Sequence, residues 1–161
     1  MKLKLYFLRH GEADNRQDWH GDDSERPLTA GGKKRMKREA AGMRKLKLPL
    51  DIIISSPLVR ALQTAEIVAK AHGSTARLVT DGRLRPGFGP KHLAALVAEH
   101  RDARGLMLVG HEPDFSETIS RVTGGGRLVM KKGALAYVEV EDRDSVKGSL
   151  VWLAPPKVLE L

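Results

Sequence analysis

Two arginines and two histidines of this sequence have the types and spacing of a phosphate-handling site. Arg9 and His10 directly follow an apolar run, and the glycine after them ends it. Arg60 lies shortly after a second apolar run, and His111 follows a later one, residues 106–109. Two guanidiniums and two imidazoles suit a tetrahedral phosphate dianion, because arginine offers a planar fork of donors that matches two phosphate oxygens. We interpret Arg9 as a group that holds a phosphoryl group and His10 as the nucleophile that attacks it.

The protonation states of the two histidines decide whether they can do this chemistry. Histidine is a competent nucleophile because, with an unperturbed pKa of about 6.5, much of it is neutral near pH 7. A neutral His10 needs its other ring nitrogen held by an acceptor, such as a backbone carbonyl. Donation to a phosphoryl oxygen would favour a protonated His111, whereas the two arginines would disfavour it. Both forms of His111 therefore stay open.

Each of these residues alone is a weak signal. A single histidine after a strand is usually a polar cap, and an arginine early in a helix is usually a surface residue. Gly110-His111 alone is compatible with a simple turn. The hypothesis therefore depends on a fold that brings the four side chains together.

Apolar runs alternate with helical patterns and predict an α/β fold. Continuous apolar runs indicate buried strands, and the last two strands are expected at an edge of the sheet, where they can be antiparallel. The expected strands are 2–8, 51–55, 77–80, 106–109, 134–140 and 149–153. The expected helices are 29–46 with Thr29 as N-cap, 57–71, 91–101 and 113–122. The pattern indicates a three-layer sandwich with a mainly parallel central sheet flanked by helices.

Such a sheet would place the candidate residues side by side. The carboxyl ends of parallel strands share one edge, and ligands bind outside that edge. Arg9 and His10 follow the first strand, Arg60 follows the second, and His111 follows the fourth. We therefore expect one pocket that contains all four. Pro57, as the first helical residue, would add a helix N-terminus that favours an anion.

Composition limits the classes of protein that this sequence can represent. With 161 residues, 41% hydrophobic and 30% charged, one globular domain over 1–161 is expected. The absence of cysteine excludes disulfides, thiolate metal sites and cysteine nucleophiles. Neither a signal peptide nor a membrane span is evident, so a cytoplasmic protein without membrane contact is expected.

The charge balance bears on the partners of the protein. A net charge of +8 favours anionic partners in general. Aromatic residues, at 4%, are too few for a base-stacking surface, so nucleic acid is not expected. The first expected helix has a basic face formed by Lys33, Lys34, Lys37, Arg38, Arg44 and Lys45. Its ordinary explanation is a solvated surface, and the alternative is a docking surface for an acidic protein.

Three segments resemble the motifs of the histidine phosphatase superfamily, also called the phosphoglycerate mutase-like superfamily. They are Leu8-Arg9-His10-Gly11-Glu12-Ala13, the segment from Ser55 to Ala65, and Val109-Gly110-His111-Glu112-Pro113. The resemblance implies the phosphoglycerate mutase-like fold, phosphorylation of His10, and hydrolysis of the phosphohistidine by water. It also implies a phosphate pocket completed by Arg9, Arg60 and His111, with no metal and no organic cofactor.

Within the superfamily, the short chain and residues 26–32 resemble the SixA-type phosphohistidine phosphatases, which act on histidines of signalling proteins. Esterase and mutase members usually carry an acidic residue after a leucine in the loop that follows the third strand. Here that position reads Leu84-Arg85-Pro86. An alkoxide leaving group benefits from a general acid, whereas the imidazole of phosphohistidine leaves more readily. Asp81 is the nearest carboxylate, and a turn residue is its simpler explanation.

The favoured hypothesis is a monomeric phosphatase that acts on a phosphohistidine protein in signal transduction. A small-molecule phosphomonoesterase of the same superfamily stays open, and it would need Asp81 or another acid. A phosphate- or nucleic-acid-binding module without turnover is a third hypothesis. A mutase is less favoured, because no extended insertion is present to enclose a sugar phosphate.

Overall fold

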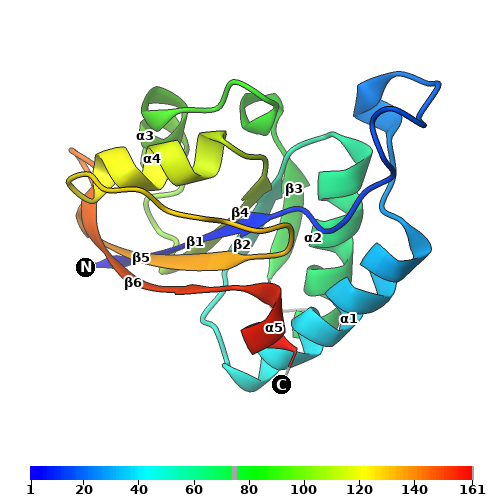
Figure 1. The fold of residues 1–161 in the computed structure, drawn as a ribbon. Helices are drawn as coiled ribbons and strands as arrows, with labels where there is room; N and C mark the ends of the chain where they lie inside the picture. Colours follow the sequence, from blue (N-terminus) through cyan, green and yellow to red (C-terminus); the bar gives the residue numbers. More distant parts are fainter. Residues whose placement is uncertain (74–75, 161) are drawn as a thin grey trace.

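The computed structural model describes residues 1–73 and 76–160, in which strands and helices alternate (Figure 1). The strands are β1 (Leu3–Arg9), β2 (Ile52–Ser55), β3 (Arg77–Thr80), β4 (Gly105–Gly110), β5 (Leu135–Asp142) and β6 (Lys147–Ala154). The helices are α1 (Ala30–Lys45), α2 (Val59–His72), α3 (Pro90–Glu99), α4 (Asp114–Val122) and α5 (Pro156–Leu159). Two short 3-10 helices lie in loops, η1 (Asp23–Glu25) and η2 (Gly82–Leu84).

The six strands form one sheet in the order β3-β2-β4-β1-β5-β6. β2 pairs in parallel with β3 and β4, and β1 pairs in parallel with β4. β5 pairs antiparallel with β1 and with β6. The mainly parallel sheet predicted from the sequence is therefore confirmed. β6 forms one edge of the sheet, β3 forms the other, and β5 separates β6 from β1.

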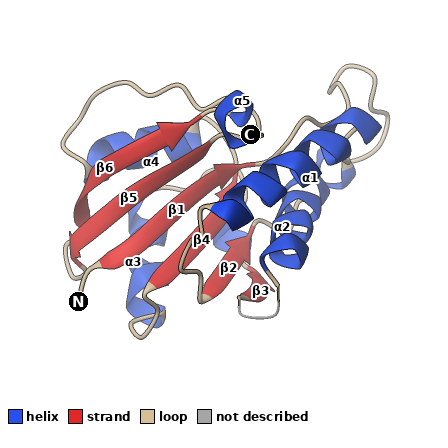
Figure 2. Ribbon diagram, turned by 90° about the horizontal axis from the view of Figure 1, so that it is seen from below, coloured by secondary structure: helices blue, strands red, loops and turns tan. Residues whose placement is uncertain are grey.

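Alternate residues of the central strands face two different helical layers. Leu3, Leu5 and Phe7 of β1 belong to the hydrophobic core shared with α3 and α4. Tyr6 and Leu8 belong to the core shared with α1 and α2. Figure 2 shows α1, α2 and α5 in front of the sheet and α3 and α4 behind it. Burial of both faces explains the continuous apolar runs in the sequence, and the three-layer α/β prediction is confirmed.

The starts of α1 and α2 differ in their agreement with the sequence. Thr29 caps α1, because its Oγ1 accepts a hydrogen bond from the N–H three residues later at 2.8 Å. α2 begins at Val59, so the expected start at Pro57 was wrong. The Ser56 hydroxyl accepts a hydrogen bond from the N–H of Leu58 at 3.2 Å, and Leu58 stays extended (φ −61°, ψ 135°). The chain therefore turns at Pro57 and Leu58 before the helix starts.

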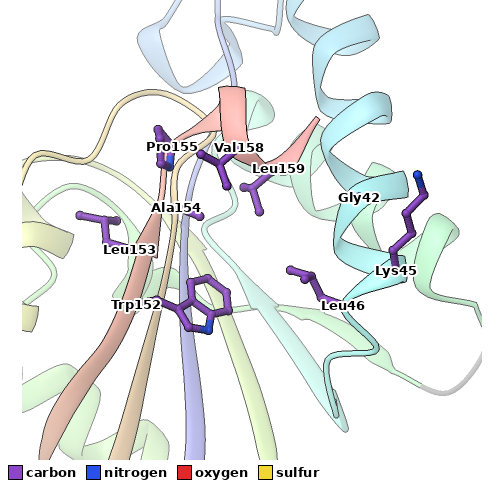
Figure 3. A pocket seen from close by; sticks show the side chains of 9 residues that line it. All are labelled: Gly42, Lys45, Leu46, Trp152, Leu153, Ala154, Pro155, Val158 and Leu159. Carbon is purple, nitrogen blue, oxygen red and sulfur yellow. The ribbon is translucent and has the colours of Figure 1, made fainter. Parts of the chain in front are cut away.

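The short helix α5 was not expected from the sequence. Together with the ends of α1 and β6 it encloses a groove of about 420 Å³ (Figure 3). Trp152 and Leu159 line this groove, which contains none of the four candidate residues. Among the described residues, no helix combines the length and the apolar character needed to cross a membrane.

Candidate active site

Arg9 and His10 lie where β1 leaves the sheet, and backbone hydrogen bonds hold them there. The N–H of His10 donates to the carbonyl of Gly110 at 3.1 Å, which joins the ends of β1 and β4. From the turn before β5, the N–H of Gly133 donates to the carbonyls of Arg9 at 3.1 Å and His10 at 3.0 Å. The position of both side chains is thus determined by backbone pairing on both sides of β1.

The imidazole of His10 is buried and held in one tautomer. Its Nδ1 lies 2.7 Å from the carbonyl oxygen of Gly11. A carbonyl can only accept, so Nδ1 carries the proton and Nε2 keeps its lone pair. Burial lowers the pKa of His10 to about 3, and the positive charges of Arg60 and Arg9 act in the same direction. His10 is therefore neutral at pH 7, with Nε2 available as a nucleophile.

Thr64 ties the turn at His10 to helix α2. The N–H of Gly11 donates to Oγ1 of Thr64 at 3.0 Å, and that hydroxyl donates to the carbonyl of Arg60 at 2.8 Å. A Cβ atom at residue 11 would lie 2.6 Å from Cγ of Met36 in α1. Glycine is needed here because the turn passes so close to α1.

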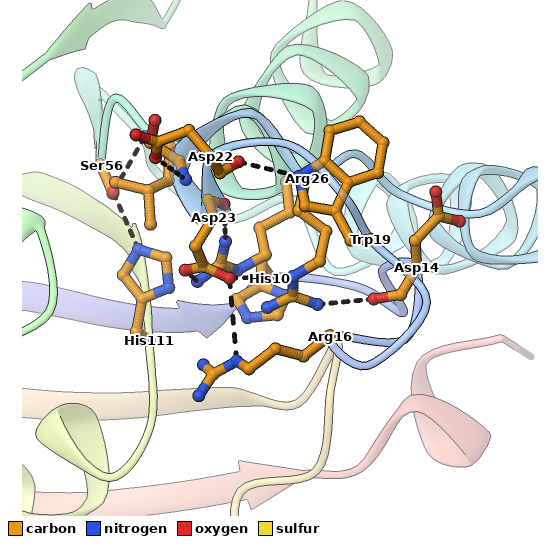
Figure 4. Close-up of polar contacts among 12 residues, drawn as sticks. His10, Asp14, Arg16, Trp19, Asp22, Asp23, Arg26, Ser56 and His111 are labelled. Carbon is orange, nitrogen blue, oxygen red and sulfur yellow. Dashed lines mark hydrogen bonds and ion pairs between the residues drawn. The ribbon is translucent and has the colours of Figure 1, made fainter.

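Arg60 is almost completely buried and is held by Asp23 of η1. Its Nη1 donates to the backbone carbonyl of Asp23 at 2.9 Å, and its Nη2 donates to Oδ2 of Asp23 at 3.1 Å. The same carboxylate contacts Nε of Arg26 at 3.0 Å and Nε of Arg16 at 3.7 Å. Figure 4 shows the Asp23 carboxylate with Arg16 and Arg26 close to His10. One carboxylate of the long loop thus gathers three guanidiniums at the site.

His111 lies opposite His10, with 5.3 Å between the ring centroids. Its Nε2 is 2.8 Å from the hydroxyl of Ser56, a contact that orients the ring (Figure 4). Burial lowers the pKa of His111 to about 4, Arg60 lowers it further, and Asp23 opposes this. His111 is therefore neutral in the free protein. A phosphate dianion bound beside it would raise its pKa and favour donation to a phosphoryl oxygen.

Three buried nitrogens of these residues have no hydrogen-bond partner in the described part of the chain. They are Nε of Arg9, Nε of Arg60 and Nδ1 of His111. The Nη1 group of Arg9, by contrast, donates to the carbonyl of Met130 at 2.8 Å. The two arginine nitrogens are donors, whereas the role of Nδ1 of His111 depends on the tautomer. A buried polar atom without a partner costs about 1 to 3 kcal/mol, so unpaired nitrogens on three residues are the arrangement expected before an oxyanion binds.

The four residues predicted from the sequence line one cavity of about 700 Å³. Their joint placement is therefore observed, although they come from three separate strand ends. The cavity has further positively charged side chains, Arg16, Arg26 and Lys132, and three carboxylates, Glu12, Asp14 and Glu112. The Glu112 carboxylate accepts a hydrogen bond from the first turn of α4, through the N–H of Ser116 at 2.7 Å.

Asp81, the candidate acid of the sequence, does not line this cavity. Its carboxylate accepts a hydrogen bond from the N–H of Arg83 at 2.9 Å and pairs with that guanidinium at 2.7 Å. It acts as the cap of η2, which agrees with a turn residue. Pro86 lines the cavity instead, so the loop after β3 brings no carboxylate to it.

The sequence did not reveal the residues whose hydrogen bonds and ion pairs hold the site residues in place. Thr64 lies four residues after Arg60, which is the spacing at which a threonine hydroxyl bonds a preceding carbonyl in a helix. Ser56 precedes Pro57, and this position in the sequence does not indicate that its hydroxyl contacts His111. Asp23 lies three residues before Arg26, a spacing that indicates their mutual contact but not the contact with Arg60.

Comparisons with known sequences agree with this geometry. The sequence model of the histidine phosphatase superfamily (branch 1) matches residues 5–90. An uncharacterized protein of Picosynechococcus is 39% identical over 137 residues, which cover 83% of this chain and 82% of that protein. The probable phosphoglycerate mutase GpmB of Escherichia coli is 34% identical over 117 residues, which cover 67% of this chain. They cover 51% of the mutase, so this chain matches about half the length of that relative.

Solved structures share the fold. The protein histidine phosphatase SixA in complex with tungstate has a TM-score of 0.82 and 24% identity, over 96% of this chain and 98% of that one. A mycobacterial glucosyl-3-phosphoglycerate phosphatase has a TM-score of 0.71 and 19% identity, over 94% and 98% of the two chains. At these identities the likeness concerns the fold alone. The match over residues 5–90 and the 39% identical relative show that the chain belongs to the histidine phosphatase superfamily, branch 1.

Proposed function

We propose that this protein is a phosphohistidine phosphatase that removes the phosphoryl group from a histidine of another protein. The main support for the proposal is the state of His10, which is neutral and held in one tautomer. It lies in one cavity with Arg9, Arg60 and His111. The loop after β3 adds no carboxylate to this cavity. The likeness of the fold to SixA supports the same choice.

The reaction would proceed through a phosphorylated His10. Arg9 and Arg60 hold the phosphoryl oxygens and neutralise the charge that develops on them. Nε2 of His10 forms a bond to phosphorus while the P–N bond to the substrate imidazole breaks, and the electron pair stays on that imidazole. A water molecule then attacks the phosphorus of phosphohistidine 10. Inorganic phosphate leaves, and His10 regains its lone pair.

The leaving group is the reason for preferring phosphohistidine over an alkyl phosphate. A positioned general acid typically contributes about 10²- to 10⁴-fold to a rate when the leaving group is poor. The Glu112 carboxylate accepts a hydrogen bond from the N–H of Ser116 in α4, and the Asp81 carboxylate forms a salt bridge with Arg83. Glu12 and Asp14 are the remaining cavity carboxylates, and a phosphomonoesterase would have to recruit one of them. The side chain of Glu12 is exposed, and that of Asp14 is half-buried.

This proposal predicts a clear order of substrates. The value of kcat/KM for phosphoramidate and for a phosphohistidine protein should exceed that for alkyl phosphates by at least about 10²-fold, the smallest usual contribution of a general acid. Release of inorganic phosphate from each substrate at equal concentration measures the order. Equal or faster turnover of a sugar phosphate would instead favour the small-molecule phosphomonoesterase.

Asp23 is expected to act as a positioning residue for Arg60. Asp23→Asn should lower kcat about tenfold, because one charged hydrogen bond is worth about 1.5 kcal/mol. Asp18→Asn, in the exposed part of the same loop, is the matched control. Steady-state kinetics on phosphoramidate separates kcat from KM. An unchanged kcat with a lower KM would mean that Asp23 competes with the phosphoryl group instead of positioning Arg60.

A further inference from the structure

A second cavity of about 530 Å³ adjoins the catalytic cavity. The two cavities share Arg9, Glu12 and Lys132 as lining residues, so they meet at the arginine that precedes the nucleophile. The other walls of the second cavity come from α1, from the turn before β5 and from α5. The turn before β5 thus contacts both cavities, because the N–H of Gly133 also holds the carbonyls of Arg9 and His10.

The second cavity is strongly basic. Arg35, Lys131, Lys132 and Lys157 line it together with Arg9. Within the described residues, the three lysines have no acidic partner within salt-bridge distance. Arg35 pairs with Glu160 at 2.7 Å, and Glu160 is not a lining residue. Three unpaired ammonium groups from two separate segments therefore surround one hollow.

Little negative charge opposes these groups. The two acidic residues that line the cavity are Glu12 and Glu39. Glu39 is completely buried, and this burial raises its pKa to about 8, so that it is mostly neutral at pH 7. Glu12 is then the one other acidic lining residue, against Arg9, the three unpaired lysines and Arg35, which pairs with Glu160. The cavity is therefore suited to an anionic group that arrives together with the phosphoryl group.

We propose that this second cavity binds a carboxylate side chain of the protein that carries the phosphohistidine. The proposal rests on the proposed function and adds a determinant of substrate choice to it. Because the two cavities adjoin, a glutamate or aspartate near the phosphohistidine on the partner surface would reach the lysines while the phosphoryl group occupies the site at His10. Lysine ammonium groups offer point charges on flexible stems, which suits a carboxylate whose position varies among partners.

The test uses two chemically phosphorylated histidine peptides, one with glutamates flanking the histidine and one with glutamines. The full-length protein should turn over the glutamate peptide with at least about fivefold higher kcat/KM, mostly through KM, as expected for a few partly exposed charge pairs. Lys131→Glu/Lys157→Glu should abolish or invert this preference. Lys33→Glu/Lys37→Glu on the exposed face of α1 has the same change in charge and should keep it.

A binding measurement separates this proposal from the proposed reaction. Calorimetry with the unphosphorylated glutamate peptide should show at least about fivefold weaker binding to Lys131→Glu/Lys157→Glu than to the α1 control variant. Lys157→Glu alone, which leaves the turn beside Arg9 intact, should weaken binding in the same direction. Equal binding of both peptides, or equal loss in the α1 control, would overturn the carboxylate site. Failure to hydrolyse phosphoramidate would overturn the proposed reaction only.

Discussion

His10→Ala is expected to lower phosphatase activity by about 10⁴-fold or more, the loss typical for removal of a covalent nucleophile. Arg9, Arg60 and His111 would still bind phosphate, but no lone pair would remain to attack it. The neutral state of His10 at pH 7 follows from burial, which lowers its pKa to about 3. Radiolabelled phosphoramidate, quenched in alkali within the first turnovers, should leave an acid-labile label on the wild-type protein and none on the variant.

The control for this experiment is His20→Ala. His20 is exposed in the long loop and does not line the catalytic cavity, so label and turnover should match the wild type. Circular dichroism and thermal unfolding check that His10→Ala stays folded. An acid-labile label that persists in His10→Ala would assign the nucleophile to another histidine, with His111 the first to be tested. Turnover without any labelled intermediate would argue for direct attack by water.

Glu39→Gln is expected to stabilise the fold by about 2 to 4 kcal/mol at pH 7, as the linkage between pKa and folding requires. Both carboxyl oxygens of Glu39 are buried, and no described residue forms a hydrogen bond with them. They pack against Gly133, where an added Cβ would lie 2.7 Å from Oε2. Burial raises the pKa of Glu39 from 4.5 to about 8, whereas Arg35 lowers it.

The sign of this effect depends on pH. Between pH 4.5 and about 8 the unfolded chain releases the proton of Glu39 while the folded chain keeps it, so stability falls as pH rises. Glutamine has no proton to release. The variant should therefore match the wild type at about pH 4.5 and exceed it increasingly up to about pH 8. Urea unfolding at several pH values measures the difference in the free energy of unfolding.

Glu66→Gln on the exposed face of α2 is the control for Glu39→Gln. Glu66→Gln removes a carboxylate that is exposed to water, whereas Glu39→Gln removes a buried one. The stability of Glu66→Gln should follow that of the wild type at every pH. If Glu39→Gln gave the same difference at pH 4.5 and pH 8, the effect would come from packing. The raised pKa of Glu39 would then not be the cause.

The sequence determined the fold class and the gathering of the four candidate residues. Strands buried on both faces read as unbroken apolar runs, as in residues 52–54 and 106–109, and they require helices on both sides. Once the strands are parallel, Arg9, His10 and His111 must lie at the same edge, because all of them follow carboxyl ends. The order of the strands and of these residues in the sequence is enough for this conclusion.

The tertiary structure decided which distant residues contact the site and which polar groups are buried or unpaired near it. Asp23 reaches Arg60 across 37 residues of sequence, and Gly133 holds the carbonyl of His10 from the far side of β1. The burial of Glu39 and the unpaired lysines of the second cavity depend on how α1, α5 and the turn before β5 pack together. The periodicity of a sequence indicates which face of a helix or strand is apolar. The charge partner and the pKa of a side chain depend instead on the distant segment that packs against it and excludes water.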